Sequence, residues 1–204
     1  MAILHRATIA PTKAQLVADW LPRQPWFAGP AGPVVPVAAY RFDDPDGVVG
    51  IESHVFDVAG RAVHVPLTYR GAPLQGAEPW LVGTMEHSVL GTRWVYDAVG
   101  DLVYRAELDR VIREGDGQVE LFVETLDGPQ RREPTMHVRG SGADGVPADA
   151  EIVVVRDLTA APAPAPSAAS APPSGVLTGT WPGQPSSVVL ARLAVAGQGG
   201  PAVR

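Results

Sequence analysis

Three strand-like runs joined by short turns constrain the fold of this chain more than any other feature. The runs cover residues 34–42, 48–58 and 61–70, and the third alternates apolar and polar side chains. The first turn, at 43–47, reads D-D-P-D-G, and the second lies at 59–60. Aspartate, proline and glycine favour tight turns, and strands with such short connections pair antiparallel. The sequence therefore predicts an antiparallel meander with one face on a hydrophobic core.

Two helices flank this meander. Thr12 opens a capping-box pattern, and Pro22 ends the apolar stripe that follows it. Residues 71–91 have the composition of a loop and 90–98 that of a strand, after which Asp101 is a good N-cap for a second helix. Five large side chains are expected in the core: Trp20, Trp26, Phe27, Trp94 and Leu108.

The second half of the chain is rich in strand patterns. Runs at 119–124, 135–139 and 151–156 are separated by turn residues, and 187–195 reads as a further strand. Residues 159–175 are almost entirely alanine, proline and serine, which is typical of an extended or disordered linker. The expected fold class is α+β: a curved antiparallel sheet with two packed helices, extended by further strands. The expected divisions are an α+β domain at 1–115, additional strands at 116–158, the linker at 159–175, a returning β segment at 176–196 and a tail at 197–204.

Composition argues against several classes of function. A net charge of −6 gives no electrostatic reason to bind nucleic acid or an anionic membrane. Without cysteine there is no disulfide and no thiol nucleophile or ligand. A single lysine, Lys13, and no asparagine leave few of the groups that phosphotransferases use, so we expect no kinase chemistry and no cofactor. No apolar run has the length of a membrane span or secretory signal, and the expected compartment is the cytoplasm.

Three further patterns could carry chemistry. Residues 140–145 match G-x-G-x-x-G, but Pro147 and a strand follow instead of a helix, which favours a glycine-rich turn over a nucleotide site. His54 and His64 could be cross-strand neighbours and form the one plausible metal-binding pair, although polar-face positions explain them equally well. Asp97 is expected to bond backbone amides at a strand end, in preference to acting as a general base.

Two segments resemble a known family. Residues 20–29, W-L-P-R-Q-P-W-F-A-G, resemble the signature W-L-x-x-Q-R-W-[FY]-A-G-K near the start of bacterial maltokinases and related aminosugar kinases. Residues 90–98, L-G-T-R-W-V-Y-D-A, are similar to a later segment of the same N-terminal cap. Pro25 and Pro30 stand where the family has arginine and lysine. The resemblance implies a cystatin-like cap over about residues 12–115.

In full-length kinases of this family the cap precedes an intermediate subdomain and a large lobe with the catalytic acids. Residues 176–193 are similar to the intermediate subdomain, but its serine-rich phosphate loop is shortened here to G-Q-P-S-S-V-V at 183–189. The resemblance therefore implies a non-catalytic interaction or regulatory module linked to α-glucan, maltose, trehalose or aminosugar metabolism. Its expected partner is a kinase-like or glucan-metabolism protein. The expected interaction surface comprises Arg23, Gln24, Trp26, Phe27, Trp80 and His87.

Two other functions stay open. A protein that binds or senses a small molecule such as a sugar would use the concave face of the sheet, with Trp80 or Trp94 as a stacking platform. A divergent enzyme would use His54, His64 or Asp97.

Overall fold

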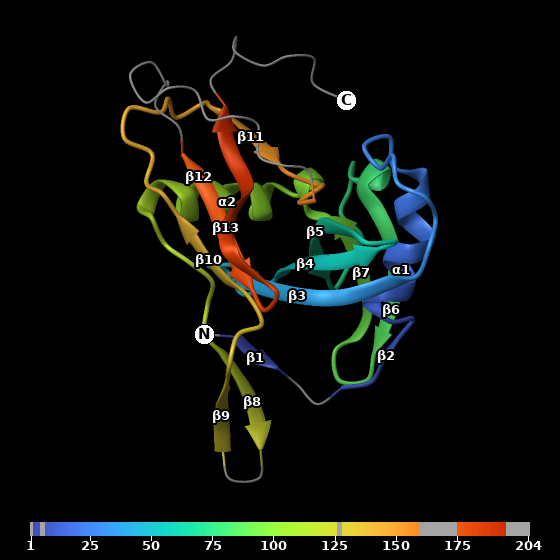
Figure 1. The fold of residues 1–204 in the computed structure, drawn as a ribbon. Helices are drawn as coiled ribbons and strands as arrows, with labels where there is room; N and C mark the ends of the chain where they lie inside the picture. Colours follow the sequence, from blue (N-terminus) through green and yellow to red (C-terminus); the bar gives the residue numbers. More distant parts are fainter. Residues whose placement is uncertain (1, 5–6, 126–127, 160–174, 195–204) are drawn as a thin grey trace.

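The computed structural model describes residues 2–4, 7–125, 128–159 and 175–194 (Figure 1). The predicted tail at 197–204 and nearly all of the predicted linker at 159–175 lie outside these ranges. Within them the chain has the predicted α+β fold, with two α-helices and three β-sheets. None of the helices in the described part is long and apolar enough to cross a membrane.

The largest sheet is antiparallel and strongly curled. Its six strands are, in spatial order, β2 (Ile9–Ala10), β6 (Leu81–His87), β7 (Gly91–Asp97), β5 (Arg61–Arg70), β4 (Gly50–Val58) and β3 (Val34–Phe42). β3, β4 and β5 are the predicted meander. The turn after β3 is held by Asp44, whose carboxylate accepts hydrogen bonds at 2.8 to 3.1 Å from the backbone amides of Asp46, Val48 and Val49.

Helix α1 (Lys13–Trp20) lies in the concave face of this sheet. Its predicted capping box is complete, because Thr12 Oγ1 accepts a hydrogen bond from the Gln15 amide and the Gln15 side chain accepts one from the Thr12 amide. The helix contacts β3 at one edge of the sheet and β6 near the other. Leu16, Val17 and Trp20 are buried in this contact. The sheet therefore curls around α1.

Helix α2 (Leu102–Glu114) packs on the opposite face. Asp101 caps it as predicted, accepting a hydrogen bond from the Val103 amide at 3.0 Å. Gly115 ends it with a φ of 64°, a left-handed conformation that glycine adopts without strain.

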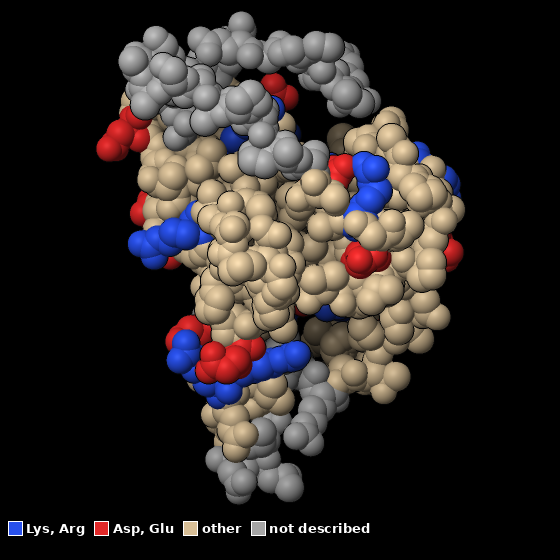
Figure 2. All heavy atoms as spheres, in the orientation of Figure 1, with Lys and Arg blue, Asp and Glu red and all other residues tan. Residues whose placement is uncertain are grey.

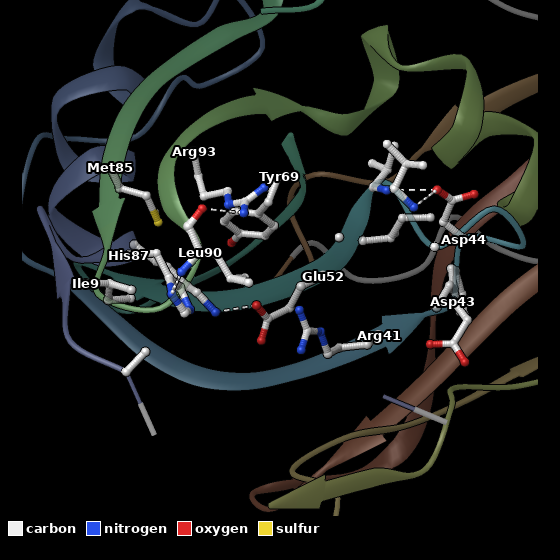
Figure 3. Close-up of a pocket in the computed structure, with 18 of the residues that line it drawn as sticks. Ile9, Arg41, Asp43, Asp44, Glu52, Tyr69, Met85, His87, Leu90 and Arg93 are labelled. Atoms are coloured by element: carbon white, nitrogen blue, oxygen red, sulfur yellow. Dashed lines mark hydrogen bonds and ion pairs between the residues drawn. The ribbon is translucent and has the colours of Figure 1, made fainter. Parts of the chain in front are cut away.

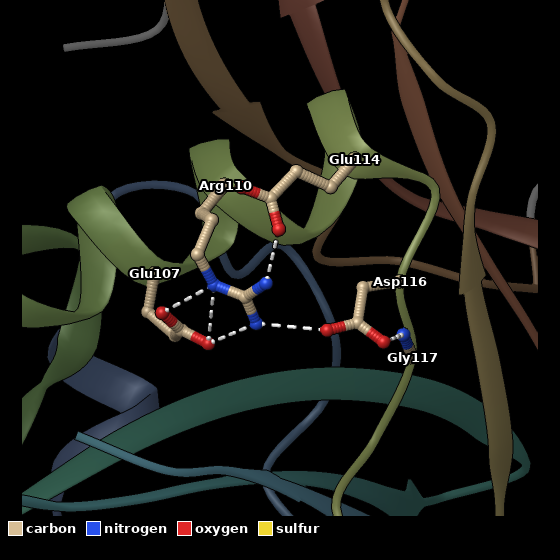
Figure 4. A network of polar contacts seen from close by, with 5 residues as sticks. All are labelled: Glu107, Arg110, Glu114, Asp116 and Gly117. Atoms are coloured by element: carbon tan, nitrogen blue, oxygen red, sulfur yellow. Dashed lines mark hydrogen bonds and ion pairs between the residues drawn. The ribbon is translucent and has the colours of Figure 1, made fainter. Parts of the chain in front are cut away.

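The last turns of α2 are tied to the chain that follows by Arg110 (Figure 4). Its guanidinium lies 2.7 Å from Glu107, 2.5 Å from Glu114 and 2.9 Å from Asp116. The hydrogen bond to Glu107, with those to the other two carboxylates, raises the pKa of Arg110. The network fixes the direction in which the chain leaves the helix.

A four-stranded antiparallel sheet covers α2. In spatial order its strands are β10 (His137–Gly140), β12 (Val176–Trp181), β13 (Gln184–Ala194) and β11 (Glu151–Val154). Their buried side chains form one hydrophobic cluster with those of α2, β3 and β4. β12 and β13 carry one charged residue, Arg192, and the face they present in Figure 2 is largely uncharged. The two halves of the chain thus share a core.

A small third sheet projects from this body (Figure 1). In it β8 (Leu121–Thr125) pairs parallel to β1 (Ala2–Leu4) and antiparallel to β9 (Gly128–Arg132). The sequence patterns did not predict β9 or β6, and the expectation of a loop over 71–91 was wrong for β6, whereas β12 and β13 form the predicted returning β segment. β6 contains Gly83, where a Cβ would lie 2.8 Å from Leu16 of α1. Glycine lowers the local strand signal, and at this position it leaves room for the Leu16 side chain.

The predicted core is partly correct. Trp20 and Leu108 are 3% and 0% exposed. Trp26, Phe27 and Trp94 are only partly buried, because the first two lie in the loop after α1 and Trp94 faces away from its buried neighbour Val95, which packs under α1.

Residues 155–159, which we call the strap, run beside the first half of β5. The His64 amide donates a hydrogen bond to the Arg156 carbonyl at 2.7 Å, and the Leu158 amide donates one to the Ala62 carbonyl at 2.8 Å. On this side β7 pairs only with the last four residues of β5. The strap therefore continues the sheet where β7 stops.

Candidate functional site

A cavity of about 780 Å³ lies on the concave face of the curled sheet, beside the first turn of α1 (Figure 3). Strands β2 to β7 and the turn after β3 contribute to its walls. Its charged and polar side chains are Lys13, Arg41, Asp43, Asp44, Glu52, Tyr69, His87 and Arg93. The volume is within the range of small-molecule sites.

The alternation along β4 explains why a buried apolar face becomes polar here. Glu52, His54, Phe56 and Val58 point to the same side of the strand. Phe56 and Val58 belong to the apolar cluster under α1, whereas Glu52 lies beyond the start of the helix and lines the cavity. Tyr69, near the end of β5, likewise lines the cavity.

Glu52 is the centre of the polar contacts. Its Oε2 accepts a hydrogen bond from Lys13 Nζ and lies 3.6 Å from His54 Nε2. The same imidazole nitrogen is 3.2 Å from the Tyr69 hydroxyl, and Lys13 Nζ stands 5.4 Å from the centre of the Tyr69 ring. One carboxylate, one imidazole, one phenol and one ammonium group are thus in mutual contact.

The surroundings set the charge of each group. Burial raises the pKa of Glu52, but attraction to His54, then to Lys13 and Arg41, outweighs burial and holds this pKa well below its usual range. Burial lowers the pKa of His54; Glu52 opposes this effect, and Lys13 and Arg41 reinforce it. Burial, reinforced by Glu52, raises the pKa of Tyr69 well above its usual value. Near neutral pH the cavity therefore presents an ionised carboxylate, a neutral imidazole and a neutral phenol.

Two arginines complete the polar lining. Arg41 is the cross-strand partner of Glu52, and in Figure 3 its guanidinium points toward the Glu52 carboxylate. The Arg41 side chain makes no hydrogen bond or ion pair within 4.0 Å with another described residue. Arg93 donates from Nη2 to the Leu90 carbonyl at 2.5 Å, and its Nε is buried with no partner in the described chain. Both guanidinium groups keep donors that a ligand could use.

The six residues of the predicted interaction surface do not lie together in the structure. His87 lines the cavity. Arg23 is exposed on the turn after α1, and Gln24 donates its side-chain amide to the Trp20 carbonyl at 3.2 Å. Of the six predicted residues, His87 alone borders the cavity.

The predicted aromatic residues also lie elsewhere. Trp26 and Phe27 pack edge to face, with ring centres 6.4 Å apart. Trp80 covers Gly100, where a Cβ would lie 2.2 Å from its ring. Neither Trp80 nor Trp94 lines the cavity, so the expected stacking platform on the concave face was wrong. Among the described residues, Phe42 and Tyr69 are the phenyl-ring side chains that line the cavity.

Asp97 does not bond backbone amides as predicted. Its two carboxylate oxygens lie 2.6 and 2.8 Å from Nη2 of Arg156 in the strap. The guanidinium carbon of Arg156 is 4.6 Å from the centre of the Trp26 ring. Asp97 is therefore one end of a buried ion pair that a long-range contact supplies.

His54 and His64 occupy adjacent register positions on β4 and β5, but they point to opposite faces. His64 Nδ1 is 3.0 Å from the Val155 carbonyl, and its Nε2 is 3.1 Å from the Tyr40 hydroxyl. The two histidines cannot share a metal. Nowhere in the described ranges do three or more acidic or histidine side chains gather as metal ligands would.

The glycine-rich segment 140–145 is a turn, as predicted. Gly140 ends β10, and the described residues that follow it up to β11 contain no helix. Gly142 and Gly145 have φ values of 80° and 76°. The segment shows no helix N-terminus that could receive a phosphate.

Sequence reasoning did not single out Glu52, Arg41 or Arg93. Each has the spacing of an ordinary polar residue on a strand. One signal was present: the face of β4 that carries Phe56 and Val58 becomes acidic at Glu52. A polar residue at the end of an apolar face can mark the place where the covering helix begins.

Comparison with known proteins agrees with the resemblance of the two sequence segments. No curated protein matches this chain. The sequence model of the maltokinase N-terminal cap domain matches residues 20–101. This range contains strands β3 to β7 and most of the residues that line the cavity, among them Arg41, Glu52, Tyr69 and Arg93. Residues 20–101 of this protein are therefore similar to a maltokinase N-terminal cap domain.

Proposed function

We propose that this protein is a non-catalytic module that binds a small polyhydroxylated molecule, such as a sugar, on the concave face of its cap domain. The observation that carries the proposal is the cavity of about 780 Å³ in which Glu52, Lys13 and Arg41 meet. Sites for small ligands combine an enclosed volume with a few convergent polar groups.

The polar groups suit hydroxyl ligands. A sugar hydroxyl both donates and accepts hydrogen bonds. Glu52 supplies an acceptor that stays ionised near neutral pH, and Arg41 and Arg93 supply donors. The family name connects the domain with maltose metabolism, so sugars of α-glucan, trehalose and aminosugar metabolism are the first to test.

The test is calorimetric titration of the purified chain with glucose, maltose, trehalose and glucosamine. Glu52→Gln should weaken binding by about tenfold or more, because hydrogen bonds to a charged acceptor are the stronger ones. Glu86→Gln is the matched control, because Glu86 does not line the cavity although its neighbour Met85 does. The Glu86 carboxylate accepts a hydrogen bond from Thr92 Oγ1 at 2.8 Å at the surface. Equal affinity of Glu52→Gln and wild type, or no binding of any sugar, would refute the proposal.

A second candidate is docking to a kinase-like protein of the same metabolism. The observation that favours it is the exposure of three large apolar side chains on neighbouring elements, Trp80, Leu81 and Leu102, which are 38%, 39% and 78% exposed. Trp80 covers Gly100, immediately before α2, so the 3-10 helix Glu78–Trp80 and the first turn of α2 adjoin. Exposed apolar patches often mark protein contacts.

This second candidate can be tested with a purified maltokinase catalytic lobe that lacks its own cap. Leu102→Glu should abolish its binding in surface plasmon resonance, and the variant should fold, since an acidic residue is favourable in the first turn of a helix. Val89→Glu, at a residue 56% exposed on the β6–β7 turn, is the control. If wild type and Leu102→Glu bind the lobe equally, these side chains have no role in docking.

A further inference from the structure

We infer that the ligand of the cavity carries an acidic group, a carboxylate or a phosphate, on its polyhydroxylated body, and that Arg41 binds this group. The inference rests on the proposed function, because it names the chemical class of molecule that the same cavity takes.

The charged side chains of the cavity are unequally paired. Lys13 is bonded to Glu52, so these two charges neutralise each other. Arg41 lies next to Glu52 in the register but makes no hydrogen bond or ion pair within 4.0 Å with any described side chain. A guanidinium has five N–H donors in a planar fork that matches carboxylate and phosphate oxygens. Arg41 thus feels the charge of Glu52, but none of its donors is used in a hydrogen bond to the described protein.

The other acidic groups of the cavity are directed elsewhere. Both oxygens of Asp44 accept hydrogen bonds from backbone amides of the turn after β3. In Figure 3 the Asp43 carboxylate points away from the Arg41 guanidinium. Asp43 and Asp44 therefore lie at the turn after β3, at one end of the cavity, whereas the Arg41 guanidinium points toward the centre of the cavity.

The positions of the polar side chains on the sheet indicate how large a ligand the cavity could bind. From β3 to β7 it presents Arg41, Glu52, Tyr69 and Arg93 in that order. Arg41 and Arg93 are three strands apart, and Arg93 also lies four residues along β7 from Asp97, the residue in register with Arg41 and Glu52. A monosaccharide bound by Arg41 through its acidic group would thus lie over Glu52 and Tyr69. Arg93, whose Nε has no described partner, would contact the far end of a longer ligand.

The experiment compares neutral and acidic sugars of one size on the full chain. Glucose, glucuronate, glucose 6-phosphate and inorganic phosphate are titrated calorimetrically into wild type, Arg41→Gln and Arg23→Gln. Arg23 is an exposed arginine away from the cavity and serves as the control. We expect at least one acidic sugar to bind about tenfold or more tightly than glucose, and Arg41→Gln to remove that advantage. Thermal unfolding of each variant checks that it is folded.

The outcomes separate this inference from the proposed function. Preference for glucuronate identifies a carboxylate ligand, and preference for glucose 6-phosphate a phosphate ligand; either supports the inference. Glucose binding as tightly as both acids would overturn the inference and leave sugar binding intact. Inorganic phosphate binding as tightly as glucose 6-phosphate would support the anion site and refute sugar recognition. An acidic preference that persists in Arg41→Gln would refute the role of Arg41.

Discussion

Arg156 and Asp97 form an ion pair that joins the two halves of this protein. Nη2 of Arg156 lies 2.6 and 2.8 Å from the two carboxylate oxygens of Asp97, and the side chains are 12% and 4% exposed. The same guanidinium lies over Trp26. Trp26 and Asp97 belong to the two segments that resemble the cap family, and Arg156 lies outside the matched range 20–101. The region that matches the cap model is thus stabilised by a residue outside the match.

Arg156→Met should destabilise the protein by about 3–5 kcal/mol, because it leaves the Asp97 carboxylate buried without a cation. Urea unfolding measures the change. Arg61→Met is the control, since the Arg61–Asp157 pair is 40% and 36% exposed and such pairs contribute about 1 kcal/mol or less. The double variant Asp97→Asn/Arg156→Met should regain part of the loss; if it is no more stable than Arg156→Met, the unpaired carboxylate is not the cause.

His64 should make stability depend on pH between about 6.5 and 3. Burial, then Arg156, lowers the pKa of His64 to about 3, against about 6.5 in the unfolded chain. The unfolded state therefore binds the extra proton in this range, and stability falls by up to about 1.4 kcal/mol per pH unit as the pH is lowered. His64→Asn should show a shallower slope from pH 6.5 to 4.5. Imidazole protonation near pH 6.5 in an NMR titration would disprove this.

Glu52 should contribute to acid unfolding at lower pH. Since its folded pKa is held well below the usual range, its stabilising effect is complete above the unfolded value of about 4.3 and is lost as the pH falls through the folded pKa. Unfolding free energies of wild type and Glu52→Gln, measured from pH 7 to pH 2.5, should therefore converge at low pH. A constant difference between the two curves would show that Glu52 ionises as in the unfolded chain.

Gly140→Ala should cost about 3 kcal/mol or more, at the upper end of overpacking effects. A Cβ at this position would lie 2.1 Å from the Val111 carbonyl oxygen and 2.9 Å from Ile112 Cα, both in the backbone of α2. The helix would have to move away from β10. Gly32→Ala places its Cβ 3.6 Å from Ala59 Cβ, an ordinary contact, and should be close to neutral. Similar melting temperatures for the two variants would contradict the close approach of β10 and α2.

Local signals allowed much of the fold to be predicted. The capping box of α1, the Asp101 cap of α2 and the alternation in β5 each lie within a few residues, so the sequence displays them directly. β6 pairs with the strand that follows it, but its sequence does not show a clear strand pattern. Its glycine, Gly83, leaves room for the Leu16 side chain of α1 and weakens the local strand signal.

The candidate site was less accessible to sequence reasoning for a related reason. Lys13 and Glu52 are 39 residues apart, and neither belongs to a motif. Their contact follows from the curl of the sheet around α1, which places the first residue of the helix over the start of β4. Aromatic residues were the stronger signal in the sequence, but Trp26 and Trp80 are on other surfaces.

The strap has a consequence for self-association. Without residues 155–159, the amides and carbonyls of the first half of β5 that now bond Arg156 and Leu158 would form an open strand edge. Such an edge can pair with the same strand of another molecule and begin an aggregate. By occupying these groups, the strap keeps the cap domain from acting as a template for its own copies.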